Sequence, residues 1–378
     1  MTAIPSFTGD AQPYGGGDPY ADHRTADFPF TRHADLADRR LGASVVAAND
    51  EFFAQRENLL LPGRAVFDPE HFGHKGKVMD GWETRRRRGA SAGHPWPADG
   101  DHDWALIRLG APGVVHGIVV DTAHFRGNYP QSVSVEGTAA DGSPAPEDLL
   151  ADGVEWTTLV PRTPVGGHAA NGFAVSAERR FTHLRVSQYP DGGIARLRVH
   201  GEVAPDPEWL AALSVFDVVA LENGGRVEDA SDLFYSPAAH TIQPGRSRKM
   251  DDGWETRRRR DRGNDWIGYR LTAESEIRAI GIDTAYLKGN SAGWASVSVR
   301  NEADGGGGDA GEWREILPRT RLQPDTAHRF PLPAPSPAAT HARIDIYPDG
   351  GISRLHLHGT PTARGLAALR TRHRELGG

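Results

Sequence analysis

The sequence predicts an all-β protein built from two copies of one β-sandwich domain. Glycine (45) and proline (27) are frequent among the 378 residues, so the chain must contain many turns and few long helices. Short segments alternate polar and apolar side chains, which is the period of a strand with one buried face. The third observation is an internal repeat that runs through most of the chain. Long repeats that are rich in short strands and turns are typical of sandwich domains.

Four strings of residues occur twice, in the same order each time. The first is DGWETRRRR, and the last contains a YPDGGI turn. The paired segments are 80–88 with 252–260, 117–128 with 279–290, 159–163 with 316–320, and 182–201 with 340–359. Matches in a fixed order do not arise by chance, so the chain is a tandem duplication. We expect a disordered arm at 1–30, sandwich repeats at 31–203 and 204–361, and a helical tail at 362–378.

The individual elements follow from local patterns. Predicted strands alternate around Trp104 and Trp266, and again just before each repeated Tyr-Pro-Asp-Gly-Gly turn. In chain order the alternating segments are 100–109, 132–135, 184–187, 263–271, 295–299 and 343–346. Helical patterns are short and few, and they cover about 36–40, 208–213 and 363–376. Strands therefore dominate both predicted repeats.

The first repeat carries two extra stretches. Ten more residues separate Pro62 from Asp80 than separate their counterparts Pro244 and Asp252. A second stretch of ten lies within 88–103. Long loops on a repeated scaffold are common places for function, although simple padding is the alternative.

Composition excludes several classes of function. The chain has no cysteine, so disulfides, cysteine-based zinc sites, iron–sulfur clusters and thiol nucleophiles are ruled out. Its net charge of −7 speaks against nucleic acid as a partner. No run approaches the roughly 18 apolar residues of a membrane-spanning helix, and 1–30 lacks the pattern of a signal peptide. We therefore expect a cytoplasmic protein without a membrane partner.

The most distinctive string contains a repeated run of four arginines. If 85–88 is a strand, Arg85 and Arg87 share one face, while Arg86 and Arg88 share the other. Neighbouring guanidinium groups repel each other unless an anion lies between them, and a bidentate grip on a carboxylate is their natural use. The alternative is internal pairing, because both copies of the run must fold. The acidic candidates for such pairing are Asp121, Asp191, Asp283 and Asp349.

Two carboxylates flank the tryptophan of the same string. Asp80 and Glu83 stand on either side of Trp82. The second copy has Asp252 and Glu255 in the same places. A carboxyl group beside an indole can have a raised pKa and act as a general acid. The alternative is a turn-capping aspartate and an ion-paired glutamate.

One histidine distinguishes the two copies. His124 lies in a segment that the copies otherwise share, and the second copy has Tyr286 at this place. The scaffold therefore does not need the imidazole, which favours a catalytic role. The alternative is ordinary surface variation.

A pair of histidines has the spacing of metal ligands. His356 and His358 would lie on one face of a strand, but the first copy has Arg198 in place of His356. We therefore predict neither a metal site nor a cofactor. Dependence of the activity on a divalent metal stays open as the alternative. If the activity depended on a metal, the ligand candidates would be this histidine pair and the loop that contains His71 and His74.

Five strings stand out in the first copy, namely MDGWETRRRR, HDWALIRLG, VDTAHFRGNYP, LVPRT and YPDGGIARLRVHG. With them the chain resembles the allantoicase family over about 35–359. The resemblance implies two jelly-roll β-sandwiches similar to galactose-binding domains, hydrolysis of allantoate to ureidoglycolate and urea in purine breakdown, and assembly into homo-oligomers. An extra Asp251, and Tyr286 in place of His124, indicate that the two copies are not equivalent sites.

The chemistry of allantoate suits the residues singled out above. Its central carbon bears a carboxylate and two ureido groups, so cleavage needs a cation, an acid for the departing urea and a base for water. We expect Arg85 or Arg87 to hold the carboxylate, with the insertions as walls. The residues expected to transfer protons are Asp80, Glu83 and His124. Those expected to bind substrate are Trp82, Arg85, Arg87, Asp252, Glu255 and Arg257.

Two other functions stay open at this point. One is a tandem lectin without catalysis, in which aromatic side chains such as Trp96, Tyr129 and Trp294 stack on sugar rings. The other is hydrolysis of a related ureide such as ureidoglycine.

Overall fold

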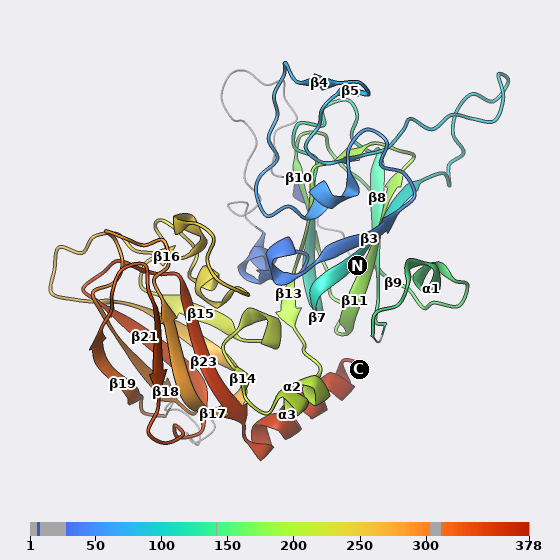
Figure 1. Ribbon diagram of the computed structural model, residues 1–378. Coiled ribbons are helices and arrows are strands. Elements are labelled where there is room, and N and C mark those ends of the chain that lie inside the picture. The colour runs from blue at the N-terminus through green and yellow to red at the C-terminus, as the bar shows by residue number, and fades with distance from the viewer. Residues whose placement is uncertain (1–5, 8–27, 141, 303–310, 378) are drawn as a thin grey trace. The chain divides into compact units, whose positions relative to one another are not determined.

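The strands of the sequence repeat recur in the structure, once in each of two units (Figure 1). The computed structural model describes residues 6–7, 28–140, 142–302 and 311–377. One unit comprises Met1–Glu202 with Leu376–Gly378, and the other comprises Val203–Glu375. The arm expected at 1–30 falls mostly outside the described residues.

In the first unit one long strand, β7 (Asp103–Asp121), belongs to both layers of the sandwich. Its N-terminal part pairs with β3 and β11, and its C-terminal part pairs with β10 and β13. These partners are β3 (Ser44–Ala48), β10 (Ala170–Ala174), β11 (Arg180–Tyr189) and β13 (Arg196–Val203). The sheet goes on through β8 (Ser132–Thr138) to β9 (Thr157–Pro164), and is extended by β1 (Ser6–Phe7) on β10 and β2 (Ala34–Asp35) on β13.

Two small antiparallel pairs lie beside this sheet. One is a hairpin in the first insertion, β4 (Phe72–Gly73) with β5 (Gly76–Lys77). The other joins the arginine string to the YPDGGI turn through β6 (Trp82–Glu83) and β12 (Gly193–Ile194). The second pair brings the two most distinctive repeated strings together.

The second unit repeats this plan around the long strand β17 (Asp265–Asp283). Its first part pairs with β15 and β21, and its second part with β20 and β23. These partners are β15 (Arg226–Ala230), β20 (Ala327–Pro331), β21 (Ala339–Tyr347) and β23 (Arg354–Pro361). The remaining strands are β14 (Phe216–Asp217), β16 (Trp254–Glu255), β18 (Trp294–Arg300), β19 (Arg314–Arg321) and β22 (Gly351–Ile352). The prediction of an all-β chain with two jelly-roll sandwiches is confirmed.

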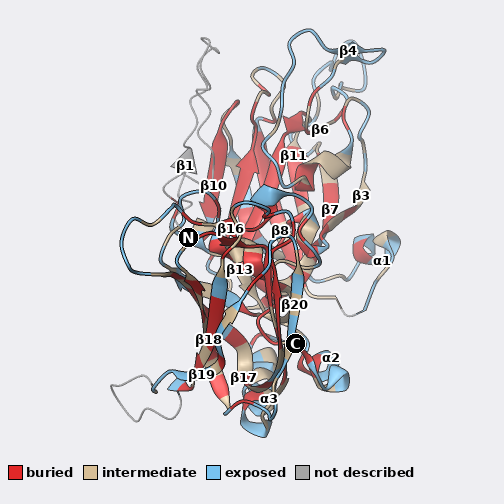
Figure 2. Ribbon diagram, turned by 60° about the vertical axis from the view of Figure 1, so that its left-hand side comes forward, coloured by how far each residue is buried: buried red, intermediate tan, exposed pale blue. Residues whose placement is uncertain are grey.

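Matched tryptophans anchor the repeated string in each core. Trp82 and Trp254 have no exposed surface. Their indole Nε1–H groups donate to the carbonyl oxygens of Asp50 (2.7 Å) and Asp232 (2.8 Å). Burying an indole while satisfying its single donor fixes the string firmly on the sandwich. Figure 2 shows the buried residues concentrated on the strands of both units.

Helices are few, as expected. The α-helices of the described chain are α1 (Pro146–Leu150), α2 (Pro207–Leu213) and α3 (Ala363–Glu375). The last two confirm the expected helices near 208–213 and 363–376. The segment near 36–40 instead ends in a single 3₁₀ turn, because the Asp38 carboxylate caps Arg40 and Gly42 takes a left-handed φ of 104°. The 3₁₀ turns are η1 (Pro29–Arg32), η2 (Arg39–Leu41), η3 (Arg56–Leu60), η4 (Leu221–Asn223), η5 (Ala238–Ile242) and η6 (Met250–Asp252).

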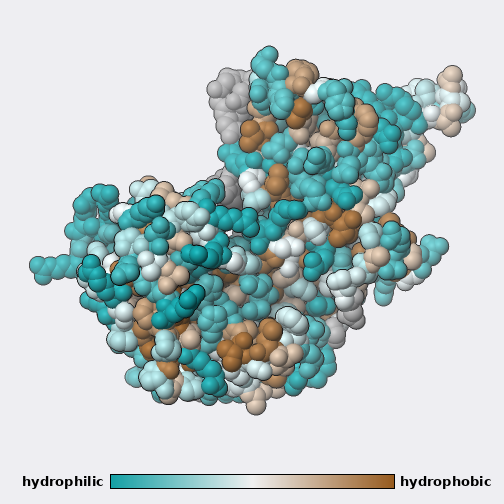
Figure 3. Space-filling view, in the orientation of Figure 1, coloured by the Kyte–Doolittle hydropathy of each residue, from teal (hydrophilic) through white to brown (hydrophobic). Residues whose placement is uncertain are grey.

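The surface is largely hydrophilic in the view of Figure 3, where apolar side chains form small scattered groups. Most large apolar side chains are buried, many of them on the strands, although some, such as Trp96 and Trp209, are exposed. None of the helices among the described residues is long and apolar enough to cross a membrane.

Candidate active site

The first unit contains a cavity of about 1110 Å³ where its two insertions meet the repeated strings. The first insertion contributes Phe67, Lys75, Lys77 and Met79 to the wall, and the second contributes Pro97. The remaining side chains come from the arginine string, from the turn after β7 and from the YPDGGI turn. The polar ones are Glu83, Thr84, Arg86, Arg87, Arg88, His124, Arg126, Asn128, Tyr129, Gln131 and Asp191.

Two of the four arginines in the string are held by acids of their own unit. The Arg85 Nε–H donates to Asp50 at 2.8 Å, and the Arg87 guanidinium lies 2.6 Å from Asp103. The same contacts recur in the second unit, where Arg257 pairs with Asp232 and Arg259 with Asp265, each at 2.8 Å. Asp191, one of the acids expected to pair, accepts the Arg87 backbone N–H instead. This face of the string therefore serves the scaffold in both units.

The opposite face of the string points into the cavity. Arg86 and Arg88 are exposed and line it, although the run 85–88 follows β6 and is not itself part of a strand. Within the described chain, no carboxylate pairs with the Arg86 guanidinium. Arg85, which we expected to hold the substrate, is absent from the wall, whereas Arg87 lines it while paired to Asp103.

The cavity carries an excess of positive charge. Six cationic side chains line it, against the two carboxylates of Glu83 and Asp191. Lys77 is fixed over the Phe67 and Phe72 rings, with its Nζ 5.0 and 4.3 Å from their centroids, and it also donates to the Pro69 carbonyl. A cavity with this balance favours a small anion.

Glu83 is the half-buried carboxylate of this cavity. Its Oε1 accepts a hydrogen bond of 2.9 Å from the Asn128 amide. Burial raises the pKa of Glu83, and the Asn128 bond and the charge of Arg86 only partly oppose this shift. A carboxyl group of this kind holds its proton to higher pH than a free glutamate, which suits a general acid.

His124 enters the cavity from the turn after β7. Its backbone takes a left-handed φ of 67°, and its N–H donates to the Nδ1 atom of His168 at 2.8 Å. The imidazole stacks on Phe67, with 5.4 Å between ring centroids, and its Nε2 lies 3.3 Å from the carbonyl oxygen of Ala65. The first insertion therefore positions this ring.

The second unit makes the same turn without the imidazole. Tyr286 has a φ of 66°, and its N–H donates to the Asp325 carboxylate at 2.7 Å. The backbone geometry is thus a property of the scaffold. The histidine and the insertion that orients it are found only in the first unit.

Asp80 lies outside the cavity wall and serves the packing beneath it. Its Oδ2 lies 2.8 Å from the Arg196 guanidinium, which is 2% exposed, and accepts the Val66 N–H at 2.8 Å. In the second unit Asp252 pairs with the equally buried Arg354 at 3.2 Å. Both aspartates thus neutralise a buried arginine at the same place in the fold.

This arrangement predicts a loss of stability for Asp80→Ala. Removing the carboxylate leaves Arg196 with carbonyl acceptors only, so we expect the free energy of unfolding to fall by about 2–3 kcal/mol. Urea denaturation followed by tryptophan fluorescence measures this change. Asp99→Ala is the control, because the Asp99 side chain is 96% exposed and its pair with Arg162 should contribute little. Equal midpoints for the two variants would contradict the prediction.

The remaining predicted residues lie in packed or paired positions. Trp82 is fully buried and has no contact with the cavity space. Asp252 and Arg257 belong to the ion pairs described above, and the Glu255 backbone N–H donates to Ser236 at 3.1 Å. The second unit therefore supplies matched positions for control experiments.

The histidine pair of β23 is engaged with an acid. His356 Nδ1 lies 2.7 Å from Asp217, which raises the pKa of His356 and favours its protonated form. Protonation opposes metal binding. His71 and His74 are exposed on the insertion, and they are not part of a group of three ligand side chains among the described residues.

Comparison with known proteins agrees with this architecture. The sequence matches the allantoicase repeat family at residues 34–204 and 216–362. A probable allantoicase of Streptomyces coelicolor is 78% identical over 377 residues, which cover 100% of this chain and 98% of the relative. One of Nocardia farcinica is 48% identical over 336 residues, covering 89% and 97%. The crystal structure of allantoicase from Saccharomyces cerevisiae is 30% identical with a TM-score of 0.69, covering 86% of this chain and 92% of that chain.

The fold defines a tandem β-sandwich protein, and its first unit has a cavity lined mostly by cationic side chains. The matches extend over both repeats and almost the whole chain. The chain belongs to the allantoicase family. The reaction of this family is hydrolysis of allantoate to ureidoglycolate and urea, which makes the chain a hydrolase of carbon–nitrogen bonds.

Proposed function

We propose that allantoate is hydrolysed in the cavity of the first unit. The observation that carries this proposal is the excess of cationic side chains around a half-buried carboxylate and an imidazole. The substrate is a small anion whose cleavage needs one acid and one base, and the cavity wall offers one of each. The second unit has the scaffold of the site but lacks the insertions and the imidazole.

In this proposal Arg86 holds the carboxylate of allantoate. Its guanidinium can offer two parallel N–H donors to the two oxygens, and among the described residues it forms no ion pair that the substrate would have to break. Arg126 and Lys75 add positive charge to the same wall. Arg87, by contrast, would have to leave Asp103 to bind the substrate.

Glu83 and His124 then divide the proton transfers. The protonated Glu83 gives its proton to the ureido nitrogen as the bond from this nitrogen to the central carbon breaks, and urea departs. The lone pair of the remaining ureido nitrogen stabilises the carbon during this step. His124 takes a proton from water as its oxygen bonds to the carbon, which yields ureidoglycolate. Proton exchange with solvent restores both groups.

His124 and Tyr286 occupy matched turns in the two units. Exchanging these two residues tests whether the active site lies in the first unit. We expect His124→Tyr to lower kcat for urea release from allantoate by about 10²-fold or more, because the base is lost. The fold should be kept, since the second unit carries tyrosine on the same backbone. Tyr286→His is the matched control and should retain wild-type kinetics. Normal kcat in His124→Tyr, or loss in Tyr286→His alone, would move the site away from this cavity.

Two further proposals follow from the sequence. The resemblance to the family supports a homo-oligomer, which size-exclusion chromatography with light scattering would test. A cytoplasmic location likewise stays a proposal, which cell fractionation would test.

A further inference from the structure

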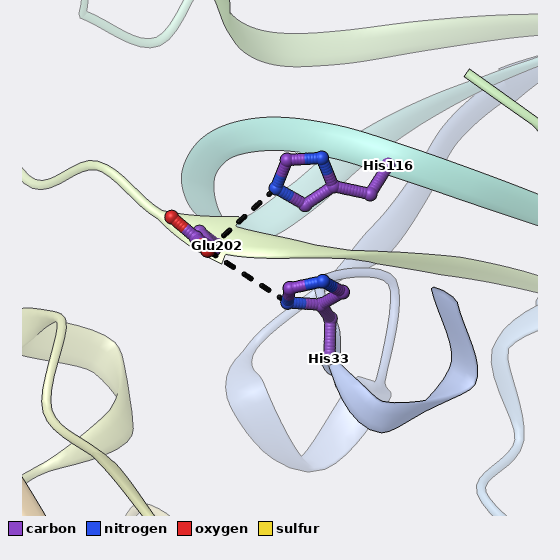
Figure 4. A group of neighbouring side chains, drawn as sticks. All are labelled: His33, His116 and Glu202. Carbon is purple, nitrogen blue, oxygen red and sulfur yellow. Dashed lines mark ion pairs between the residues drawn. The ribbon is translucent and has the colours of Figure 1, made fainter. Parts of the chain in front are cut away.

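A second group of polar side chains lies on the first unit, outside the cavity. His33 follows η1, His116 belongs to β7, and Glu202 belongs to β13 (Figure 4). His33 Nδ1 and His116 Nε2 lie 3.9 and 3.8 Å from the same oxygen of Glu202. The three ligand atoms all lie within 4.8 Å of one another. Within the described chain, no other group of three histidine or acidic side chains meets this criterion.

Hydrogen bonding does not account for this cluster. The contacts to Glu202 are longer than hydrogen bonds, and the buried Nε2 of His116 has no hydrogen-bond partner among the described residues. The two imidazoles approach each other to 4.5 Å between centroids.

The second unit shows that the fold does not require these residues. The positions equivalent to His33, His116 and Glu202 hold Val215, Arg278 and Thr360. There the Arg278 Nε–H donates to Thr360 Oγ1 at 3.4 Å, so the same two strand positions face each other in both units. Where the second unit has the contact between Arg278 and Thr360, the first unit has three side chains that can bind a metal.

We propose that His33, His116 and Glu202 form a binding site for a divalent transition metal such as Zn²⁺. Two imidazoles and one carboxylate are a ligand set that suits Zn²⁺, with water in the fourth position. Ligand bonds of about 2.0–2.1 Å would require each side chain to move inward by roughly half an ångström. The side chains are 19%, 26% and 41% exposed, so the cluster is open to water and to entry of the ion.

The bound metal would connect the segment before β2 to the strands β7 and β13 of the first unit. None of its three ligands lines the cavity, so the metal acts on stability and not on the hydrolysis. Because the ion binds the folded chain only, its effect is a rise in Tm that grows with metal concentration.

The experiment uses the full untagged chain, freed of metal with a chelator that is then removed. Co²⁺ is titrated as the probe, because its visible absorption reports nitrogen and oxygen ligands directly. We expect absorption that saturates with one Co²⁺ bound per chain and is abolished by Zn²⁺. At a Zn²⁺ concentration roughly a hundred times Kd, Tm should rise by about 5 °C or more.

The decisive variant transfers the residues of the second unit into the first. The double substitution His116→Arg with Glu202→Thr should fold, lose the Co²⁺ absorption and the Tm shift, and hydrolyse allantoate within about twofold of wild type. His356→Ala is the control and should bind Co²⁺ normally. Absence of binding in the wild-type chain, or binding that survives in the double variant, would refute the site. If the folded double variant lost the ability to hydrolyse allantoate, the claim that the metal site is separate from the reaction would be refuted.

Discussion

Glu83→Gln should lower kcat for allantoate hydrolysis by about 10²–10⁴-fold, the usual contribution of a positioned general acid. The amide has the shape of the carboxyl group, and its oxygen can still accept the hydrogen bond from Asn128. It cannot deliver a proton to the departing urea. Urea release at saturating allantoate measures the effect. Glu255→Gln in the second unit is the matched control and should leave kcat unchanged.

The stability of Glu83→Gln separates a lost acid from a damaged fold. Burial raises the folded-state pKa of Glu83 above its unfolded value, so the ionised group destabilises the folded chain as pH rises through that pKa. The neutral amide removes this cost. We therefore expect the urea midpoint at pH 8 to equal or exceed that of the wild type. A lower midpoint that accompanied the lost activity would point to a structural role.

The raised pKa of Glu83 should also determine how kcat/KM declines toward high pH. Only the protonated form of Glu83 serves as the acid, so kcat/KM of the wild type should fall as pH rises through the raised pKa. The variant should lack this limb. An unchanged profile in Glu83→Gln would assign the acid to another residue.

Much of the architecture could be predicted because it depends on local patterns and on the repeat. Polar and apolar side chains alternate at 132–135 and 343–346, and both segments lie within the strands β8 and β21. The insertions were expected to form walls of the site, and the first one supplies Phe67 and Lys77 to the wall of the cavity. These features can be found by comparing the chain with itself.

The orientation of the arginine string could not be predicted in this way. Alternation separates Arg85 from Arg86, but it does not say which face meets the scaffold. The deciding acids, Asp50 and Asp103, come from distant parts of the chain and reach the string only when the sandwich forms. A signal was present, however, because both acids recur in the second repeat as Asp232 and Asp265, as structural partners should.

The sequence analysis also missed residues of the cavity and of the histidine cluster, because these residues come together only through tertiary contacts. Asn128 and Arg126 enter the cavity from a turn whose pattern carries no information about its neighbours. His33, His116 and Glu202 come together because η1, β7 and β13 are adjacent in the fold, and no spacing in the sequence connects them. Trp82 looked like a binding residue because it is central to the string, whereas it is buried as its anchor.

The second large effect is expected for Arg86→Ala, which should lower kcat/KM for allantoate by about 10²-fold, mostly through KM. Hydrogen bonds to a charged group contribute about 1.5–3 kcal/mol, and a bidentate grip on the carboxylate is lost as a whole. Arg86→Lys should restore part of the affinity as a point charge. Arg258→Ala is the matched control, since this arginine occupies the same place in the second unit.

The variant Arg85→Ala tests whether Arg86 or the neighbouring Arg85 binds the carboxylate of the substrate. The Arg85 side chain is 66% exposed and its partner is Asp50, so its loss should change stability little and leave KM near the wild-type value. If Arg85→Ala raised KM strongly and Arg86→Ala did not, the substrate would be bound by Arg85, and Arg86 would be the residue that serves the scaffold. Because the same scaffold contacts occur in both units, we expect the Arg86 face alone to bind the substrate.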